Sequence, residues 1–585
     1  MYKAHRSVAE LCDPNISAVF FSHLDSGGFP HLIHRNDPNL SENQADQDDA
    51  DFGLTENHVE ENRLQQDDYQ WLMNYSRTRS SNSFLLGIRE LDLAYTWPQS
   101  WHGFSFEHLL SWIKKTKDNI VLQSSQSHPV DISSFSVMQQ KAYNLVHKHT
   151  FGSHQDDQLL MLVLGTAGTG KSFLINAIDQ LFKTRDCSQC LKITAPTGIA
   201  AANIQGSTIY SLIPLLQHSI TRHRLHSLQM MMMDVKLLII DEYSFLSVAI
   251  IDKLDQHLRK IFPRKSNVPF GGLNILLCGD PAQLPPVNGK PLYAYQGSSS
   301  HLAARFHLFD KVVELDHVFR QSGNDQSQIK FRNLLTRVAN CEASEDDWRL
   351  LQTRRPSCLS KEDNNSFDVS KFIVSTNDAR HQINHDKLSK FSPVIKITDC
   401  DGDVTNIDDD SIEAEHVNPK NPQLYAVGAE VMLTANLWTE VGLVNGACGT
   451  VVAILKPEDN RKLYVLMVDI PSYHGPALSP SHPTIVPITH MSTLNFSGIP
   501  LTLAWAITIH KSQGMTLERV TIDLGDTEFS SGLTFVALSR AKTFHGLRIM
   551  PFDFDRYARI ANGTHVHARR AEMQRLRLLA KNTIG

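Results

Sequence analysis

Eight consecutive residues have the types and spacing of a loop that binds phosphate groups. They read GTAGTGKS and are Gly165, Thr166, Ala167, Gly168, Thr169, Gly170, Lys171 and Ser172. An apolar run precedes them and a segment with helical spacing of apolar residues follows, which is the context that such a loop requires. Glycines let backbone N–H groups face the phosphates, and the start of the helix adds positive charge. We expect Lys171 to reach the β and γ phosphates of ATP and Ser172 to hold Mg²⁺.

Two adjacent carboxylates follow a later apolar run. The segment LLIIDEYS places Asp241 and Glu242 at the end of a strand that we predict to be buried. Neighbouring carboxylates in this position can take different roles. We expect Asp241 to coordinate Mg²⁺ through water, and Glu242 to orient and deprotonate the attacking water.

Three more residues have the chemistry that phosphate transfer needs. Gln283, in CGDPAQLPPV, follows another strand end and is a neutral donor suited to sensing the γ phosphate. Arg320, in HVFRQ, and Arg540, in VALSRAK, can supply positive charge near the transition state. With Lys171 and the two carboxylates they complete the expected catalytic set.

Apolar runs alternate with helical patterns from about Ser134 onward, which predicts an α/β fold with parallel sheets. The first sheet comprises LLMLVLG (159–165), LKITAP (191–196), VKLLIID (235–241) and LNILLCGD (273–280). A second sheet begins at KFIVSTN (371–377) and resumes at LTLAWAITIH (501–510). Between them AVGAEVMLTAN, GTVVAILK and KLYVLMVDI alternate like antiparallel strands, which predicts a small inserted β-barrel.

Composition and charge exclude some classes of protein. The chain has 585 residues, 41% of them hydrophobic, and no apolar run long enough to predict a membrane span. Residues 1–68 carry 14 acidic and 4 basic side chains, a net charge of −10, which leaves +4 on the rest of a chain whose total is −6. The overall charge therefore neither supports nor excludes DNA binding, because a groove needs only a local basic lining.

The N-terminus and the cysteines indicate an intracellular protein. Glu10 and Asp13 interrupt any apolar core of a secretory signal, and eight cysteines are scattered without a framework. We expect the nucleus first, with the mitochondrion as the alternative. Cys187 and Cys190 lack a second pair that would complete a zinc site, so we interpret them as ordinary thiols.

Eight motifs together resemble, in order, those of superfamily-one DNA helicases of the petite-integration-frequency (Pif) type and their RecD-like relatives. They are FSVMQQKA, GTAGTGKS, TAPTGIAAANIQGSTIYSL, IIDEYSFLS, CGDPAQLPPV, FRQ, AWAITIHKSQGMTL and FVALSRAK. The stretch 252–272 resembles the segment that marks the Pif branch, and 428–437 with 442–451 resemble that family's entry into its inserted barrel. The resemblance covers about residues 131–550.

The resemblance implies an ATP-dependent DNA helicase that moves 5′ to 3′ on single-stranded DNA, with two RecA-like lobes and an SH3-like barrel. It implies that Gln139 reads the adenine of ATP. It also implies DNA contacts from both lobes, by Thr197, Gly198, Thr208, His510, Lys511 and Ser512. The chain departs from the family in having Tyr210 where a histidine is usual.

The predicted organisation has six parts. Residues 1–69 are a largely disordered acidic region, and 70–130 a small segment rich in tryptophan. Lobe 1 spans 131–330, lobe 2 spans 331–424 and 498–555, and the inserted barrel spans 425–497. Residues 556–585 form a basic C-terminal helix, which either adds phosphate contacts or is a solvated surface helix.

We expect a role in DNA repair, recombination or telomere maintenance, with ATP and Mg²⁺ as cofactors. The expected partners are single-stranded DNA and duplex junctions, with no membrane, and the expected unit is a monomer. Two alternatives stay open, a DNA-tethering protein without motor activity and a helicase remnant derived from a transposon. A nucleotide kinase or AAA-type remodeller is disfavoured because neither needs IHKSQGMTL paired with VALSRA.

Overall fold

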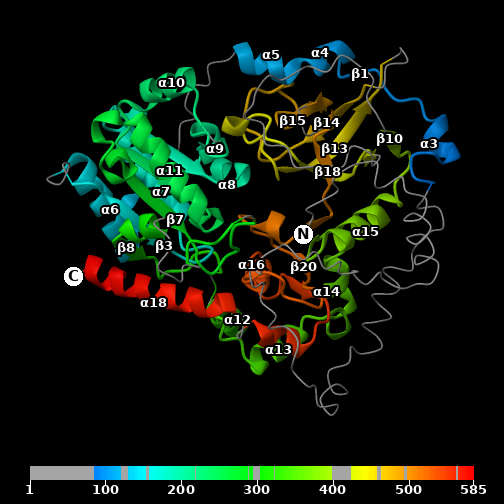
Figure 1. Ribbon diagram of the computed structural model, residues 1–585. Helices are drawn as coiled ribbons and strands as arrows, with labels where there is room; N and C mark the ends of the chain where they lie inside the picture. The colour runs from blue at the N-terminus through cyan, green and yellow to red at the C-terminus, as the bar shows by residue number, and fades with distance from the viewer. Residues whose placement is uncertain are drawn as a thin grey trace, which may run out of the picture. The chain divides into compact units, whose positions relative to one another are not determined.

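The computed structural model describes most of the chain after residue 84 (Figure 1). The described residues are 85–119, 130–152, 157–217, 219–287, 289–293, 303–321, 323, 325–397, 423–457, 463–492, 497–560 and 564–584. All of them fall in one compact unit, Asn62–Gly585. The predicted acidic region 1–69 lies outside them. Within these residues no helix is both long and apolar enough to cross a bilayer.

Lobe 1 is built on a six-stranded parallel sheet, in the order β5-β4-β6-β7-β3-β8. Its strands are β3 (Leu160–Leu164), β4 (Leu191–Ala195), β5 (Ser207–Thr208), β6 (Leu237–Ile240), β7 (Asn274–Gly279) and β8 (Lys311–Glu314). Its helices are α6 (Val137–Phe151), α7 (Lys171–Lys183), α8 (Gly198–Asn203), α9 (Ile209–Leu212), α10 (Arg222–Met232) and α11 (Val248–Ile261).

Both faces of this sheet are covered, which explains the continuous apolar runs of its central strands. Along β3, Leu160, Leu162 and Leu164 pack on the side of α11, whereas Met161 and Val163 pack on the side of α6 and α7. Since successive side chains of a strand point to opposite faces, every residue of β3 must then be apolar. The sequence prediction of a doubly covered parallel sheet is confirmed.

Lobe 2 has a four-stranded parallel sheet in the order β19-β9-β20-β21. Its strands are β9 (Lys371–Val374), β19 (Ala506–Thr508), β20 (Val520–Asp523) and β21 (Leu547–Ile549). Its helices are α12 (Gln326–Ala339), α13 (Glu345–Gln352), α14 (Lys361–Ser366), α15 (Asn377–Leu388) and α16 (Leu533–Leu538). The predicted boundary at residue 330 falls inside α12, whose buried residues belong to the lobe 2 core, so lobe 2 begins earlier than predicted.

A five-stranded antiparallel sheet, here called the inserted sheet, interrupts lobe 2 in the order β15-β14-β13-β12-β18. Its strands are β12 (Glu430–Leu433), β13 (Cys448–Leu455), β14 (Val465–Asp469), β15 (Ile485–Thr489) and β18 (Leu501–Leu503). Two short strand pairs flank it, β10 (Ile395–Ile397) with β11 (Gln423–Tyr425), and β16 (Met491–Ser492) with β17 (Ser497–Gly498). Because the strands lie in a row with β15 and β18 at its ends, the SH3-like barrel stays a prediction.

The run LTLAWAITIH divides between two sheets, which the sequence analysis did not foresee. Its first part is β18 of the inserted sheet and its second part is β19 of lobe 2. The prediction that the whole run belongs to lobe 2 was therefore wrong. Apolar residues continue through Ala504 and Trp505, so no turn residue marks the break.

The tryptophan-rich segment packs on the inserted sheet (Figure 1). It contains α3 (Glu90–Ala94), β1 (Ser100–Trp101), β2 (Phe104–Ser105), α4 (Phe106–Leu110) and α5 (Trp112–Asn119). Trp101, Phe106, Leu109 and Trp112 are buried in the same apolar cluster as the strands beneath them. The segment is therefore part of the core of this region.

The C-terminal residues form two helices, α17 (Phe554–Arg559) and α18 (Thr564–Ile584), where one was predicted. Leu576 of α18 is fully buried in the lobe 1 core, and Arg569 is 4% exposed. The expectation of a solvated or phosphate-binding helix is therefore wrong for this part of α18, because its buried face packs within the protein.

One buried carboxylate holds the N-terminal segment on the molecule. Asp92 accepts hydrogen bonds from the Gly87 N–H (2.9 Å), from Arg89 Nε (2.7 Å) and from the Val394 N–H (2.8 Å), which lies beside β10. Burial by itself would raise the pKa of Asp92, but the bonds from Arg89 and the two N–H groups outweigh it and lower the pKa.

We predict that Asp92→Ala weakens the docking of this segment by about 3 kcal/mol, because the Val394 N–H loses its acceptor and Arg89 its partner. Native-state proteolysis within 95–119 should become about 100-fold faster. The lowered pKa means that the contribution is present above the usual carboxylate pKa and disappears as the pH falls through the folded-state value. Glu90→Ala, on the exposed side of the same helix, is the matched control. Equal cleavage rates in the two variants would contradict the prediction.

Candidate functional site

The phosphate loop lies between β3 and α7, as its sequence context predicts. Gly168 has φ of +90° and Gly170, the residue before α7, has φ of +84°, a backbone region that favours glycine. A Cβ on Gly168 would collide with Arg320, so the loop and Arg320 approach closely. Lys171 is buried, and its ammonium donates to Gly165 O (2.7 Å) and Thr166 O (3.3 Å) of its own loop.

Three carboxylates lie at the ends of the neighbouring strands β6 and β7. Asp241 and Glu242 follow β6, and Asp280 follows β7. Glu242 has φ of +51°, which is uncommon for a residue with a side chain. Within the described part of the chain, Glu242 Oε2 and Asp280 Oδ2 are buried without a hydrogen-bond partner. Buried unpaired oxygens of this kind indicate a place where a ligand binds.

Residues of both lobes line one cavity of about 350 Å³ around the loop. Lobe 1 contributes Ala167, Gly168, Gly170, Lys171, Ser172, Phe173, Ala200, Asn203, Asp241, Glu242 and Gln283. Phe319 and Arg320 come from the segment that joins the lobes, and Gly514 and Arg540 come from lobe 2. The structure thus brings together the six residues expected to be catalytic.

Burial and mutual charge shift the pKa values of these groups. Burial raises the pKa of Asp241 to about 7, Glu242 adds to the rise, and Lys171 opposes it. Burial also raises the pKa of Asp280 to about 6, against the opposing charge of Lys171. Burial and then Arg320 lower the pKa of Arg540 to about 9, which leaves this guanidinium charged at neutral pH.

Arg540 is held rigidly at the end of α16. Its guanidinium donates to Val536 O (2.9 Å), Met515 O (3.2 Å) and Ser539 Oγ (2.8 Å), and it is 1% exposed. Arg320 Nη1 is buried without an acceptor among the described residues. The cavity therefore offers cations from two directions.

The remaining residues of the predicted nucleotide site support the loop. Gly165 and Thr166 supply the carbonyls that bind Lys171, and Thr169 Oγ1 donates to Thr166 O (2.9 Å). Gln139 is fully buried; its Nε2 donates to Gly170 O (3.2 Å), and its Oε1 accepts from the Ser136 N–H (2.9 Å). Gln139 thus lies against the loop, and its reading of adenine stays a prediction.

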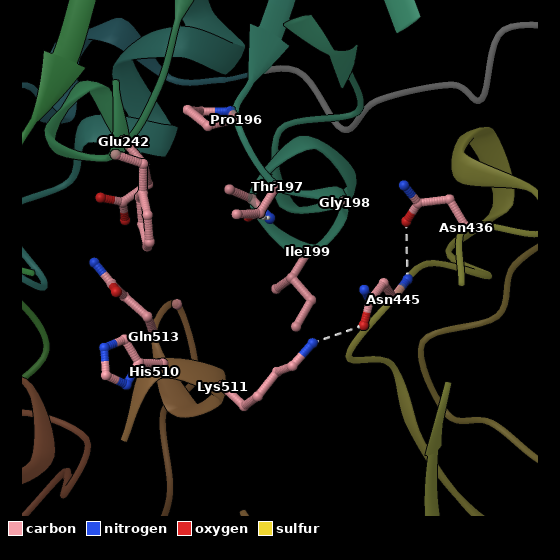
Figure 2. Close-up of a pocket in the computed structure, with 13 residues that line it drawn as sticks. Pro196, Thr197, Gly198, Ile199, Glu242, Asn436, Asn445, His510, Lys511 and Gln513 are labelled. Atoms are coloured by element: carbon pink, nitrogen blue, oxygen red, sulfur yellow. Dashed lines mark hydrogen bonds between the residues drawn. The ribbon is translucent and has the colours of Figure 1, made fainter. Parts of the chain in front are cut away.

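A second cavity of about 310 Å³ lies where lobe 1, lobe 2 and the inserted sheet meet (Figure 2). Lobe 1 contributes Pro196, Thr197, Gly198, Ile199, Ala200, Glu242 and Phe245; the inserted sheet contributes Asn436 and Asn445; lobe 2 contributes His510, Lys511, Gln513 and Gly514. Lys511 Nζ donates to Asn445 Oδ1 (2.9 Å), and the Asn445 N–H donates to Asn436 Oδ1 (2.9 Å). Four of the six residues expected to contact DNA therefore share one cavity.

The other two expected DNA contacts do not line this cavity. Thr208 is 6% exposed, and its hydroxyl oxygen accepts from the Ser211 N–H (3.1 Å) at the start of α9. Ser512 is fully buried and donates to Ile509 O (2.8 Å). Tyr210 packs against the apolar core of lobe 1. In this conformation the hydroxyls of Thr208 and Ser512 are engaged within the protein.

A pair of glutamines links the two cavities. Gln513 Nε2 donates to Gln283 Oε1 (2.7 Å), and the two side chains are 7% and 3% exposed. Gln283 lines the first cavity and Gln513 the second, whereas Glu242, Ala200 and Gly514 line both. The sequence analysis missed Gln513, Asn436 and Asn445, although each lies inside a quoted motif.

We predict that Asp241→Asn makes the protein more stable at pH 8, by about 2 kcal/mol, because it removes a charge that is buried at a cost. The folded-state pKa of about 7 lies above the ordinary value, so the folded protein holds a proton that the unfolded chain releases, and stability falls as the pH rises towards 7. Urea unfolding should show the gain at pH 8 and a smaller one at pH 5. The exposed Asp310→Asn is the control. Equal unfolding free energies of wild type and Asp241→Asn at pH 8 would contradict the prediction that the buried Asp241 charge destabilises the folded protein.

Comparison with known proteins shows what this chain is similar to. The family model for the PIF1-like helicase matches residues 134–349. The ATP-dependent DNA helicase PIF1 of Danio rerio is 31% identical over 401 residues, which cover 66% of this chain and 58% of that protein.

Two solved structures extend the likeness to the fold. One, of two coordinating Pif1 helicases unwinding forked double-stranded DNA, is 26% identical with a TM-score of 0.55, over 75% of this chain and 98% of that chain. The other, Bacteroides Pif1 in complex with ADP-AlF3 and single-stranded DNA, is 26% identical with a TM-score of 0.50, over 71% and 92%. This chain spans about 58% of the Danio rerio relative. With the loop, Asp241, Glu242 and the two arginines in one cavity, residues 134–349 match the PIF1-like helicase model, and the chain is similar to PIF1 helicases in sequence and fold.

Proposed function

We propose that the chain is an ATP-dependent DNA helicase that moves along single-stranded DNA and separates duplexes. The observation that carries this proposal is that Lys171 and Glu242 of lobe 1 and Arg540 of lobe 2 line one cavity. When both lobes hold one nucleotide, its binding and hydrolysis change the distance between the lobes. If the DNA contacts are divided between the same two lobes, those contacts move apart and together with them. The names and bound ligands of the relatives above support the same activity.

The residues of the first cavity fit Mg·ATP. The fit rests on buried groups that have no partner among the described residues, namely Glu242 Oε2, Asp280 Oδ2 and Arg320 Nη1, and on a lysine that is turned back onto its own loop. Ser172 and Asp241 are placed to hold the metal, and Lys171 to bind the phosphates. Bound Mg·ATP would supply the phosphoanhydride bond whose hydrolysis releases the free energy.

The other side chains of this cavity have distinct tasks. Glu242 orients the attacking water and accepts its proton. Arg320 and Arg540 stabilise the charge that develops on the phosphate, and they act strongly because the cavity is buried. Gln283 senses the phosphate next to them. Since one chain supplies both sides of the cavity, we propose a monomer as the active unit.

We propose that DNA passes through the second cavity. Lys511 offers a positive charge, and Asn436, Asn445 and Thr197 offer neutral polar groups suited to a backbone of any sequence. Burial lowers the pKa of His510, so its ring is neutral at pH 7, and it stacks on Phe529 with 6.3 Å between ring centroids. The hydrogen bond between Gln283 and Gln513 connects this path to the nucleotide. Movement 5′ to 3′ is proposed from the family resemblance.

We predict that single-stranded DNA raises the rate of ATP hydrolysis by at least tenfold, and that Lys171→Ala reduces the rate to near background. The lysine is the cation that reaches the β and γ phosphates, so its loss removes transition-state stabilisation. Steady-state ATP hydrolysis with and without DNA measures both effects. Equal rates with and without DNA in the wild type would favour the DNA-tethering alternative, and a strand-displacement assay would test unwinding separately.

We predict that Lys511→Met weakens binding of single-stranded DNA about tenfold, because one phosphate contact is lost. The slope of log K against log salt should become shallower by about 0.7, the value for one contact on a single strand. Fluorescence anisotropy at several salt concentrations measures both quantities. Lys542→Met is the control, since Lys542 pairs with Glu518 (2.6 Å) and does not line the cavity. An unchanged salt slope would show that Lys511 does not contact a DNA phosphate.

A further inference from the structure

The helix α18 joins the two lobes and lies beyond residues 131–550, which contain the quoted motifs. Its second half belongs to lobe 1, where Leu576 and Ala580 are buried in the core. Thr583 Oγ1 accepts from the Val312 N–H (3.0 Å), and the helix runs beside β8 (Figure 1). This half of α18 is therefore fixed to the edge of the lobe 1 sheet.

The first half of α18 is bound to lobe 2 at the end of α12. Arg570 Nη2 donates to Cys341 O (2.6 Å) and its Nε to Asn340 O (3.3 Å). Arg569 Nη2 donates to Ala339 O (3.0 Å) and contacts Cys341 Sγ. Carbonyls at the end of a helix lack partners within the helix, and arginines satisfy them with the favourable sign of charge. Both arginines therefore cap α12 and are not free for phosphate.

The second terminal nitrogen of the Arg569 guanidinium, Nη1, reaches the loop that carries Gln283. Arg569 Nη1 donates to Ala282 O (3.5 Å) and to Ser531 Oγ (3.2 Å). Gly532, with φ of +92°, lies so close that a Cβ on it would stand 2.7 Å from Ala282 O. The loop between Asp280 and Leu284 is thus part of lobe 1 in sequence but rests on lobe 2.

The burial of Leu284 also shows that the loop packs on lobe 2. Leu284 is fully buried in the core cluster of lobe 2. The Asp280 carboxylate accepts from the Ala282 N–H (2.9 Å), and the Gln283 N–H donates to Asp280 O (3.1 Å), so the turn is compact. Burial raises the pKa of Asp280, and the charge of Lys171 and the bond from the Ala282 N–H oppose that rise. The planar guanidinium can bond to groups in several directions at once, which a lysine ammonium does not reproduce.

We propose that Arg569 is a positioning residue, which clamps the Asp280–Leu284 loop to lobe 2 and so holds Gln283 in the nucleotide cavity. The C-terminal helix then becomes a part of the ATPase assembly. This inference rests on the proposed function of that cavity for its catalytic consequence, but the clamp itself is a structural statement that can be tested alone.

The kinetic test compares Arg569→Lys and Arg569→Met with the wild type in DNA-stimulated ATP hydrolysis. We expect kcat to fall at least tenfold in both variants while KM for ATP stays within threefold, because the lysine keeps the charge but not the bridge. Arg577→Met is the control on the same helix. The Arg577 side chain is 49% exposed, and its Nε lies 3.6 Å from Glu314 Oε1, so we expect no change. Unchanged kcat in Arg569→Lys and Arg569→Met, or a matching loss in Arg577→Met, would overturn the proposal.

A double-mutant cycle tests whether Arg569 acts through Gln283. If it does, Arg569→Lys combined with Gln283→Ala should hydrolyse ATP no more slowly than Gln283→Ala alone. If the fold-reductions in the hydrolysis rate of the two single variants multiply in the double variant, Arg569 acts independently of Gln283, and the positioning role is wrong.

Hydrogen exchange separates this inference from the proposed function, since it needs no ATP hydrolysis. In Arg569→Lys the amides of Ala282 and Gln283 should exchange at least tenfold faster than in the wild type. Peptides from β3 should exchange as before, which shows that lobe 1 is still folded, and Arg577→Met should match the wild type throughout. Exchange of the loop at the wild-type rate in Arg569→Lys would overturn the clamp, whatever the ATPase assay shows.

Discussion

Opposite charges buried between the two lobes are the constraint on which the rest of the structure depends. Asp241 and Glu242 line the cleft together with Lys171, Arg320 and Arg540, and the buried Asp280 at the end of the neighbouring strand β7 interacts electrostatically with Lys171 and Arg540. Each of these groups is costly to bury, and the Asp241 charge is in addition repelled by the neighbouring Glu242. Lobe 1 provides the carboxylates and Lys171, the segment that joins the lobes provides Arg320, and lobe 2 provides Arg540, so the compensating cations come from both sides of the cleft. The oxygens that stay unpaired in this arrangement are the ones that a phosphate-bound metal and a water can satisfy.

Parallel topology explains how residues so far apart in the sequence form one site. The strands β6, β7 and β3 are neighbours, and the carboxyl ends of parallel strands meet at one edge of the sheet. Asp241 follows β6, Asp280 follows β7 and the phosphate loop follows β3. This is why the loop, Asp241 and Glu242 could be assigned from sequence, because each motif comprises a buried strand and the first polar residues beyond it. Asp280 lies in the motif CGDPAQLPPV but was not predicted as a site residue.

Features that depend on tertiary contacts could not be predicted in the same way. Ser136 and Gln139 have the spacing of a capping box, but nothing local indicates that the Gln139 amide also donates to Gly170 O. Ser512 lies in a strong motif although its hydroxyl is buried. The division of LTLAWAITIH between two sheets depends on which partners β18 and β19 find. The basic composition of the C-terminal stretch favoured a surface role, whereas Arg569 and Arg570 bond to carbonyls of a helix more than 200 residues earlier in the chain. Composition reports the charge of a residue but not the partner that it meets.

The two cavities are close enough for a change in one to reach the other through few contacts. Glu242, Ala200 and Gly514 line both cavities, and one hydrogen bond joins Gln283 to Gln513. A change of less than an ångström at the nucleotide would lengthen or break that bond, since packed interfaces shift between discrete arrangements more readily than they deform. Gln513 Oε1 is buried without a partner among the described residues, so the pair leaves hydrogen-bonding capacity for a second arrangement. Arg569 and Leu284 hold the backbone of Gln283 on lobe 2 while its side chain lines the first cavity. The loop therefore links the cavity proposed for the nucleotide to lobe 2, and under the proposed function it is placed to pass a change at the nucleotide to that lobe.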